Sequence, residues 1–417
     1  MVDVWLPYGR TEVRVRISSE NLMEIAEVRE KPGIKDLTYE TEKIARGLVS
    51  SEKMAEIIRA GGKITLALNV SDASLAKLIV SSIVREIAHS GLKSENLTVV
   101  LANNPFTLRT LAAEHLRREI EPLGINVVVH DHSRDNRHIC DAEDGVRIYL
   151  NKAFSEADFK ILVSAVEPDP YILYNCCESG AAFGLTGLET IRDILAPILN
   201  ADDIQERVFR EALEVSRMAK VDFSISIIRN LSGDVVGCFA GEPEKVLHES
   251  LSAADSLYKV ALKGEPNIII ISPGGSPLDI DIFNACRCLE NALKVVRGDG
   301  IIVLVAECSE GYGKMEIQQM IKRSSGDSDL LESILRSEFS IDGFIAYRFL
   351  RALKKAEIIM STAMPDYYAS IIPRLKIFRT ANAALDYALS KLGARAKVTV
   401  IPHGNFIIPA LEDRNNL

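Results

Sequence analysis

The sequence contains no apolar run long enough to cross a membrane, and its first residues lack the basic and then apolar pattern of a secretory signal. It also has no excess of positive charge, because 58 acidic residues against 49 lysines and arginines leave a net charge of −9. A general nucleic-acid binder needs a basic surface to neutralise phosphates, so this class is disfavoured. We expect a cytoplasmic protein with no membrane or nucleic-acid partner.

A disulfide framework is lacking too, because the seven cysteines are an odd number and lie scattered along the chain. Internal repeats and low-complexity tracts are absent, and no disordered class fits the composition. What remains is a globular chain. Its 417 residues, 47% of them apolar, are enough for two domains.

The clearest positive signal is a strand, turn, helix and strand within residues 267–313. The apolar runs Ile268–Ile271 and Ile301–Val305 have the length of strands buried on both faces. A glycine turn at residues 273–275 leads into the helix between them. The expected N-cap, first helical proline and capping-box acid of that helix are Ser276, Pro277 and Asp279. These features predict one βαβ unit.

The two faces of this helix differ in character. The apolar stripe that should pack on the sheet consists of Ile282, Cys286, Leu289, Leu293 and Val296. The opposite row consists of Asn284, Arg287 and Asn291, and a helix ordinarily presents such a row to solvent.

The residues upstream predict a doubly wound α/β domain. Apolar runs predict strands at residues 63–69, 97–101, 126–130, 160–164, 223–229 and 234–240, and helical patterns predict helices at 75–90, 107–121, 203–219 and 243–262. Two prolines in the Glu-Pro-Asp-Pro segment of residues 167–170 argue against a regular element there. Residues 167–188 are therefore expected to form a long loop, where a binding site can collect.

A short Gly/Pro stretch at residues 264–266 marks the expected domain boundary. We predict an α/β fold of two domains, each with a largely parallel sheet flanked by helices, with a cleft between them. The first domain is residues 1–263 and the second, Rossmann-like domain is 264–401. The tail at 402–417 is expected to pack back on the first domain.

Ordered sequence blocks resemble those of the nickel-pincer lactate racemase family. The most specific blocks are GGSPLDIDIFNACRCLENA at residues 274–292 and IIVLVAECSEGYG at 301–313. The others are LPYGRTEVRVRI (6–17), SDAS (71–74), VVVHDHSRD (127–135), EPDP (167–170), GLTGLETI (184–191) and CFAGEPEKVLHES (238–250). The resemblance extends over most of the chain and implies the two-domain fold of the family. Activity is a separate question, because a fold does not fix a function.

The resemblance also implies a chemistry that can be compared position by position. The family uses two histidines to exchange the α-proton of its substrate, a lysine to hold the pincer cofactor and a further histidine on nickel. At the corresponding positions this chain has Asn104 and Asp169 for the first two and Ser179 for the lysine, while residues 192–195 contain no histidine. We therefore expect no nickel, no pincer nucleotide and no other cofactor.

The resemblance assigns several other residues to ligand binding. In the family's phosphate-binding block this chain keeps Asp72 and Ser74, but Leu75 replaces an arginine and a bidentate contact is lost. On the second-domain helix, the family's tyrosine, glutamine and lysine correspond to Phe283, Asn284 and Arg287. The predicted ligand-binding set is Asp72, Ser74, Asn104, Ser179, Phe283, Asn284 and Arg287, and the expected ligand is a small anionic molecule.

A histidine group and a cysteine group are candidate metal ligands. Three histidines lie within nine residues, namely His130, His132 and His138, but the first also matches a family block without a metal role. Four cysteines would supply soft ligands if the fold assembled them, namely Cys176, Cys177, Cys286 and Cys288. Core packing is the better interpretation of Cys286, because it lies on the apolar stripe.

Three functional hypotheses follow. The first is a diverged isomerase acting on a small carboxylate or 2-hydroxy acid, with Asp169 as general base and Arg287 holding the carboxylate. The second is a non-catalytic relative that binds or senses a small ligand. The third is a genuine pincer-dependent 2-hydroxy acid racemase. The sequence does not choose between the first two, and it leaves the oligomeric state open.

Overall fold

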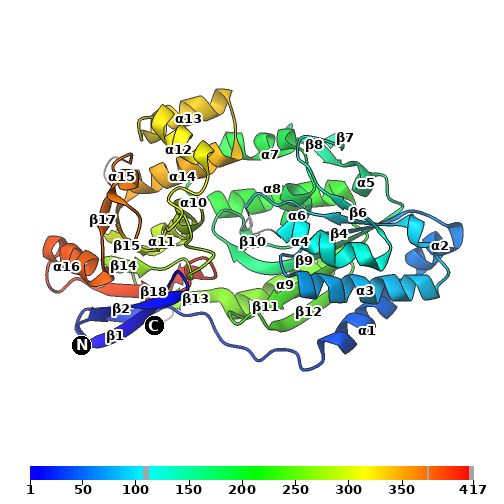
Figure 1. Cartoon of the computed structure of the whole chain (residues 1–417), viewed down its shortest axis with the longest axis horizontal. Coiled ribbons are helices and arrows are strands. Elements are labelled where there is room, and N and C mark those ends of the chain that lie inside the picture. The colour runs from blue at the N-terminus through cyan, green and yellow to red at the C-terminus, as the bar shows by residue number, and fades with distance from the viewer. Residues whose placement is uncertain (107–111, 373–374, 413–417) are drawn as a thin grey trace. The chain divides into compact units, whose positions relative to one another are not determined.

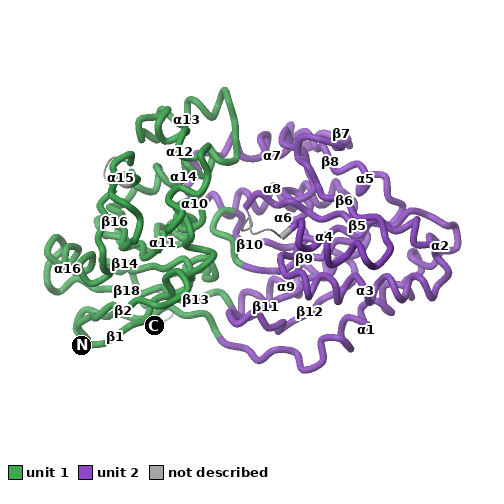
Figure 2. Tube along the Cα trace, viewed as in Figure 1, with its two compact units in different colours: residues 1–29, 168–171, 258–417 green, residues 30–167, 172–257 purple. Residues whose placement is uncertain are grey.

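The computed structural model describes residues 1–106, 112–372 and 375–412. The chain forms two compact units (Figure 2): unit 1 comprises residues 1–29, 168–171 and 258–417, and unit 2 comprises 30–167 and 172–257. The change of unit at residue 258 lies near the predicted boundary at 264–266. Residues 1–29, however, are grouped with the C-terminal part of the chain and not with the predicted first domain.

Unit 2 is built on a seven-stranded sheet of order β12-β11-β9-β4-β5-β6, with β10 paired to β9 (Figure 1). The pairs along this path are parallel except for the antiparallel β11–β12 hairpin. Its strands are β4 (Ile64–Asn69), β5 (Leu97–Leu101), β6 (Asn126–Val129), β9 (Phe159–Asp169), β10 (Leu173–Asn175), β11 (Phe223–Arg229) and β12 (Val235–Gly241). All six residues of the central strand β4 are buried, including the polar Thr65 and Asn69, and the strand lies within the predicted range 63–69.

Helices flank this sheet, and a separate hairpin pairs β7 (Asn136–Asp141) with β8 (Arg147–Asn151). The helices of unit 2 are α1 (Leu37–Val49), α2 (Glu52–Ala60), α3 (Ala73–His89), α4 (Ala112–Ile120), α5 (Lys152–Ser155), α6 (Cys177–Gly184), α7 (Leu188–Leu195), α8 (Ile204–Ala219) and α9 (Pro243–Tyr258). The main core of the unit lies where apolar side chains of α1, α3 and α4 pack on β4, β5 and β9. The first residues of the predicted helix at 107–121 lie outside the described residues.

Unit 1 contains a six-stranded parallel sheet of order β17-β16-β15-β14-β18-β3. Its strands are β3 (Leu22–Ile25), β14 (Ile268–Ile271), β15 (Ile301–Val305), β16 (Glu357–Ser361), β17 (Lys376–Phe378) and β18 (Val398–Ile401). Every residue of β14 and β15 is buried, which confirms the predicted pair of buried strands. The helices are α10 (Ile282–Ala285), α11 (Leu289–Val295), α12 (Met315–Arg323), α13 (Ser328–Ser337), α14 (Ile341–Lys355), α15 (Asp366–Ala369) and α16 (Ala381–Leu392). No helix in the described ranges is both long and apolar enough to span a bilayer.

The C-terminal segment stays within unit 1. Strand β19 (Ile408–Leu411) pairs in parallel with β13 (Lys259–Leu262). The predicted helix at 243–262 therefore ends earlier than expected, because its last four residues form β13. The tail does pack on a segment from the predicted first domain, but that segment also belongs to unit 1.

The N-terminal hairpin of β1 (Val2–Tyr8) and β2 (Thr11–Ile17) is fixed to the glycine turn after β14. The amide of Gly9 donates to Asp279 Oδ2 (2.7 Å), and the amide of Ser276 donates back to the carbonyl of Gly9 (2.7 Å). Asp279 Oδ2 also accepts from the amide of Glu307 at 3.1 Å. The segment that follows the glycine turn thus binds the backbone of the N-terminal hairpin.

Two local predictions are wrong for reasons that the structure makes clear. The helix after β14 begins at Ile282 and is capped by Asp281, whose side chain accepts from the amide of Asn284, while the amide of Ser276 donates to the hairpin. Residues 167–188 are not one loop, because β9 continues to Asp169 and β10 and α6 follow. Strand β9 tolerates Pro168 there because its pairing with β11 ends at Val166.

Candidate functional site

An ion pair between Asp169 and Arg287 forms the centre of the candidate site in unit 1. Arg287 lies in the single 3-10 turn η4 (Cys286–Cys288) that links α10 to α11. One of its terminal nitrogens donates to Asp169 Oδ2, and both side chains are only 6% exposed. Its guanidinium carbon also lies 5.5 Å from the ring centroid of Tyr171. The predicted base and the predicted carboxylate holder are therefore bound to each other.

A second buried ion pair lies one helical turn further along. Arg348 of α14 donates to both carboxylate oxygens of Glu290, at 2.7 and 2.6 Å, and the two side chains are 1% and 8% exposed. The ring of Tyr171 packs edge-on against Phe344, which is on the same helix as Arg348. Burial raises the pKa of the Tyr171 phenol well above its usual value, so this hydroxyl is neutral at physiological pH.

The polar row on this helix does not face solvent. Asn284, Arg287 and Asn291 are all buried, and Asn291 donates to the carbonyls of Gly404 and Ile407 at 2.9 Å each. Two atoms in the row have no hydrogen-bond partner among the described residues, namely Asn284 Oδ1 and Arg287 Nε. A buried polar atom without a partner is costly, so these two atoms mark a place where a ligand or water is needed.

Asp281 and Phe283 complete the set in unit 1. The backbone and side-chain amides of Asn284 both donate to Asp281 Oδ1, at 2.8 and 3.0 Å, which turns the Asn284 oxygen away from this carboxylate. The ammonium of Lys314 lies 4.8 Å from the ring centroid of Phe283. Burial raises the pKa of Asp281 to about 6, and hydrogen bonds from Asn284 only partly oppose the shift.

We predict that this carboxyl makes stability depend on pH. The folded state holds its proton up to about pH 6, whereas the unfolded chain releases it near the ordinary value of 3.8, so the free energy of unfolding falls as pH rises through that window. Asp281→Asn keeps a capping oxygen and removes the titration. Urea unfolding at intervals between pH 4 and 7 should show the variant gaining up to roughly 3 kcal/mol relative to the wild type. Parallel curves for the two proteins would contradict the assignment.

The predicted site residues of unit 2 fall into two places. In the first, Asn104 and Ser179 share the side-chain oxygen of Asn175, at 3.1 and 3.5 Å, and Asn69 donates to the same oxygen at 3.0 Å. Asn175 ends β10 inside the segment that was expected to be a loop. These side chains form a buried amide network that is held by hydrogen bonds of the chain itself.

Ser179 has a structural role at the start of α6. Its hydroxyl accepts from the amide of Cys176 at 2.8 Å and completes a capping box, and the side chain is fully buried. Burial raises the pKa values of the neighbouring thiols of Cys176 and Cys177, the latter to about 12. Both cysteines are therefore neutral thiols packed in the interior.

In the second place, Asp72 and Ser74 line an open cavity of about 550 Å³ near the start of α3. Asp72 caps this helix by accepting from the amide of Leu75 at 3.0 Å. Its other carboxylate oxygen lies 3.5 Å from Arg229, which also pairs with Glu167. Among the described residues that line this cavity, two are carboxylates, Asp72 and Asp234, and none is cationic, so its charge disfavours a phosphate.

The histidine and cysteine groups do not assemble into metal sites. His138 pairs with Asp141 at 2.7 Å, whereas His130 and His132 both contact the carbonyl of Thr186. Cys286 and Cys288 are buried thiols, and burial raises the pKa of Cys286 to about 12. Throughout residues 1–106, 112–372 and 375–412, no three His, Cys, Asp or Glu side chains are placed to hold a metal ion.

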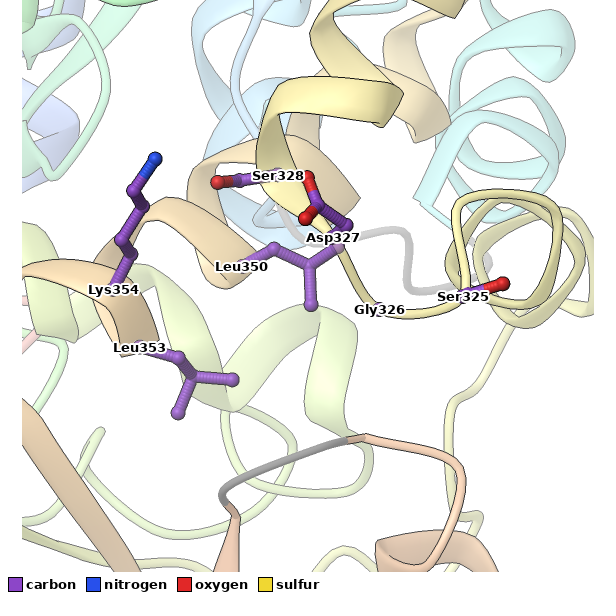
Figure 3. Close-up of a pocket in the computed structure, with 7 residues that line it drawn as sticks. All are labelled: Ser325, Gly326, Asp327, Ser328, Leu350, Leu353 and Lys354. Carbon is purple, nitrogen blue, oxygen red and sulfur yellow. The ribbon is translucent and has the colours of Figure 1, made fainter.

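A smaller cavity of about 230 Å³ in unit 1 contains none of the predicted site residues. Figure 3 shows that it is lined by residues 325–327 of the loop between α12 and α13, by Ser328 at the start of α13, and by three residues of α14, Leu350, Leu353 and Lys354. Lys354 contacts both carboxylate oxygens of Asp329, at 2.8 and 2.7 Å. The cation on this wall is thus already paired.

Sequence analysis did not predict four residues that contact the predicted set or its neighbours, namely Tyr171, Asn175, Glu290 and Arg348. Arg348 carried a usable signal, because it interrupts the otherwise apolar run at residues 343–350 and all eight of these residues are buried. A single charge inside such a run requires a buried partner. The other three gave no comparable signal, since their contacts depend on distant parts of the chain.

Comparison with known proteins gives a consistent result along the chain. Residues 8–200 match the lactate racemase N-terminal domain family, and residues 262–408 match the lactate racemase C-terminal domain family. A lactate racemase from Thermoanaerobacterium thermosaccharolyticum is 24% identical over 98% of this chain and 99% of its own length. A lactate racemase from Lactiplantibacillus plantarum is 22% identical over 98% of this chain and 100% of its own length.

Solved structures show the same fold. The lactate racemase apoprotein from Thermoanaerobacterium thermosaccharolyticum superposes with a TM-score of 0.84 at 20% identity, covering 98% of this chain and all of that one. A protein from Thermotoga maritima superposes with a TM-score of 0.62 at 14% identity, covering 92% of this chain and all of that one. The two domain families together span most of the sequence. The chain therefore belongs to the lactate racemase family.

Proposed function

We propose that the chain binds a small carboxylate of the 2-hydroxy acid class through Asn284 and Arg287 of unit 1. The observation that carries this proposal is that Arg287 already holds a carboxylate, that of Asp169, in a buried setting. A guanidinium is suited to planar carboxylates, and burial strengthens the pairing. Arg287 Nε has no partner among the described residues and is available to a ligand carboxylate that displaces Asp169.

The neighbouring amide explains why a hydroxyl on the ligand would be recognised. Asn284 lies three residues before Arg287, so the two side chains are on the same side of the helix. Asn284 Oδ1 is buried and unpartnered, and as an acceptor it fits the hydroxyl hydrogen of a 2-hydroxy acid. Lactate, the substrate named for the two relatives, has this combination of carboxylate and hydroxyl.

We propose that this binding does not use the nickel-pincer cofactor. Ser179, at the position that the resemblance assigns to the lysine, has no amine, and its hydroxyl is enclosed in the capping box of α6. Asn104, at one histidine position, donates to Asn175 and cannot act as a base near neutral pH. The residues present do not fit the group.

Whether bound acid is also isomerised depends on Asp169. Once it releases Arg287, its carboxylate is the group in this set that could remove an α-proton, and a binding-only protein would leave that proton in place. Incubation with a panel of 2-hydroxy acids in heavy water, followed by proton NMR, measures incorporation of deuterium at the α-carbon.

Ligand-induced change in melting temperature gives the second measurement. We expect at least one 2-hydroxy acid to stabilise the wild-type protein, and Arg287→Met to abolish that effect. Metal analysis of protein made together with the cofactor-synthesis enzymes should find no stoichiometric nickel. A panel without any stabilising acid would contradict carboxylate binding, and bound nickel would contradict the cofactor assignment.

A further inference from the structure

His132 lies between two backbone carbonyls that belong to different loops of unit 2. Its Nδ1 is 2.8 Å from the carbonyl oxygen of Thr186, and its Nε2 is 2.7 Å from the carbonyl oxygen of Asn103. Both distances are those of good hydrogen bonds. The side chain is half-buried, and its own carbonyl accepts from the amide of Leu188 at 3.0 Å.

The proton count of this arrangement specifies a charge state. A carbonyl oxygen only accepts hydrogen bonds, so each ring nitrogen of His132 must carry a hydrogen to make its contact. A neutral imidazole has one N–H and an imidazolium has two. Both contacts therefore exist together only when His132 is positively charged. In the neutral ring one lone pair would face a carbonyl oxygen, and that contact would be lost.

The adjacent His130 has the opposite assignment. Its Nε2 is 2.9 Å from the Thr186 carbonyl and donates to it, whereas its Nδ1 accepts from the Asn151 side-chain amide at 3.2 Å. One donor and one acceptor describe a neutral ring. Burial, together with the charge of His132, lowers the pKa of His130 to about 4, which agrees with that state. The two rings lie edge to face, 4.8 Å between centroids.

The two carbonyls belong to loops that carry candidate site residues. Asn103 directly precedes Asn104, and Thr186 follows the last turn of α6, the helix that contains Ser179. Among the described residues, one backbone hydrogen bond joins these two segments, from the Asn103 amide to the Gly184 carbonyl at 3.0 Å. His132 thus supplies a second connection between the same two segments.

We propose that His132 is a pH-dependent clamp that ties the loop after β5 to the loop after α6 when its ring is charged and releases one of them when the ring loses a proton. The charged or titratable groups near this ring are His130, whose Nε2 lies 3.3 Å from His132 Nδ1, Asp131 with its partner Arg134, and Glu189 of α7. The carboxylate of Asp131 is turned toward its own loop, where Ser133 donates to it from its amide and its hydroxyl at 2.8 and 2.7 Å. Glu189 lies near Gly187: a Cβ atom at Gly187 would be 3.1 Å from Glu189 Oε2 and 3.5 Å from the side-chain amide of Asn136, which donates to the carbonyl of His132.

Hydrogen exchange of single amides tests this clamp in the full chain. The Asn103 amide reports on the loop after β5, and the Leu188 amide reports on the loop after α6. Their protection factors, corrected for intrinsic exchange, are compared at pH 5.5 and 8. In the wild type we expect both factors to fall about tenfold at the higher pH, the effect of losing one hydrogen bond from a charged donor. Long-range proton–nitrogen spectra should show two N–H groups on His132 at the lower pH and one at the higher.

Two variants make the result specific. His132→Gln retains a donor that does not titrate, so its protection factors should be independent of pH. His138→Gln removes an exposed histidine that pairs with Asp141 and should behave like the wild type. The proposal is overturned if the wild-type factors stay constant, if the protonation of the His132 ring does not change, or if His138→Gln also removes the pH dependence.

Discussion

Replacement of Glu290 by alanine is expected to lower the free energy of unfolding by about 3–5 kcal/mol, because it leaves the buried cation of Arg348 without its carboxylate. Arg348 is 1% exposed and makes two hydrogen bonds to Glu290, so water cannot take the place of the lost oxygens. The measurement is urea unfolding at pH 7, followed by circular dichroism. This is the largest stability effect that we expect from a single polar substitution in unit 1.

The exposed pair of Glu338 and Arg323 provides the matched control. Its atoms are 2.9 Å apart, but the two side chains are 65% and 47% exposed. Glu338→Ala should therefore change stability by less than about 1 kcal/mol. The double substitution of Glu290 by methionine and Arg348 by leucine removes both charges and should recover most of the loss. A cost below 1 kcal/mol for Glu290→Ala alone would show that the pair is not desolvated as described.

The strands were predictable because their signal is local. Ile268–Ile271 and Ile301–Val305 are unbroken apolar runs, and such runs are stable only where both faces of a strand are covered. The mainly apolar segments of β4 and β5 were also located from local sequence. The apolar run itself indicates that both faces of the strand are buried, so the strand can be predicted without knowing which distant residues cover it.

The polar row of the central helix shows where local logic ends. Their spacing alone predicted that Asn284, Arg287 and Asn291 face solvent. In the structure all three are buried by residues that are distant in the sequence. Arg287 meets a carboxylate 118 positions away, and Asn291 meets carbonyls 113 and 116 positions away. Periodicity cannot show these partners, because it reports which residues share a face and not what covers that face.

Comparison with the family pattern selected candidate residues without describing their surroundings. The resemblance selected Asp169 and Arg287 independently, one as a substituted histidine and the other as a substituted lysine. Their direct pairing was not expected, because each was considered as a ligand contact and not as a partner of the other. A substitution that replaces a neutral or basic group by an acid opposite a cation can create an internal ion pair, and this possibility should be weighed with the functional one.

Asp169→Asn should raise the affinity for a small carboxylate at least tenfold, because the wild-type ligand must displace the carboxylate of Asp169 from Arg287, whereas the amide competes poorly. Without ligand, the variant should be less stable than the wild type, since it leaves a buried guanidinium without this negative charge. Titration with 2-hydroxy acids, followed by melting temperature, measures both effects. The double variant with Arg287→Met should not respond to acid, and Asp299→Asn, at an exposed pair with Arg297, should behave like the wild type.

The same variant separates catalysis from binding. If Asp169 is a base, the wild type exchanges the α-proton of its ligand for deuterium, and Asp169→Asn binds that ligand more tightly without exchange. If Asp169 is only an internal counter-ion, neither protein exchanges, and the variant differs from the wild type only in its higher affinity and its lower stability without ligand. An Asp169→Asn protein that exchanges at the wild-type rate excludes this residue as the base, and one that binds acids no better than the wild type shows that Asp169 does not occupy the carboxylate position.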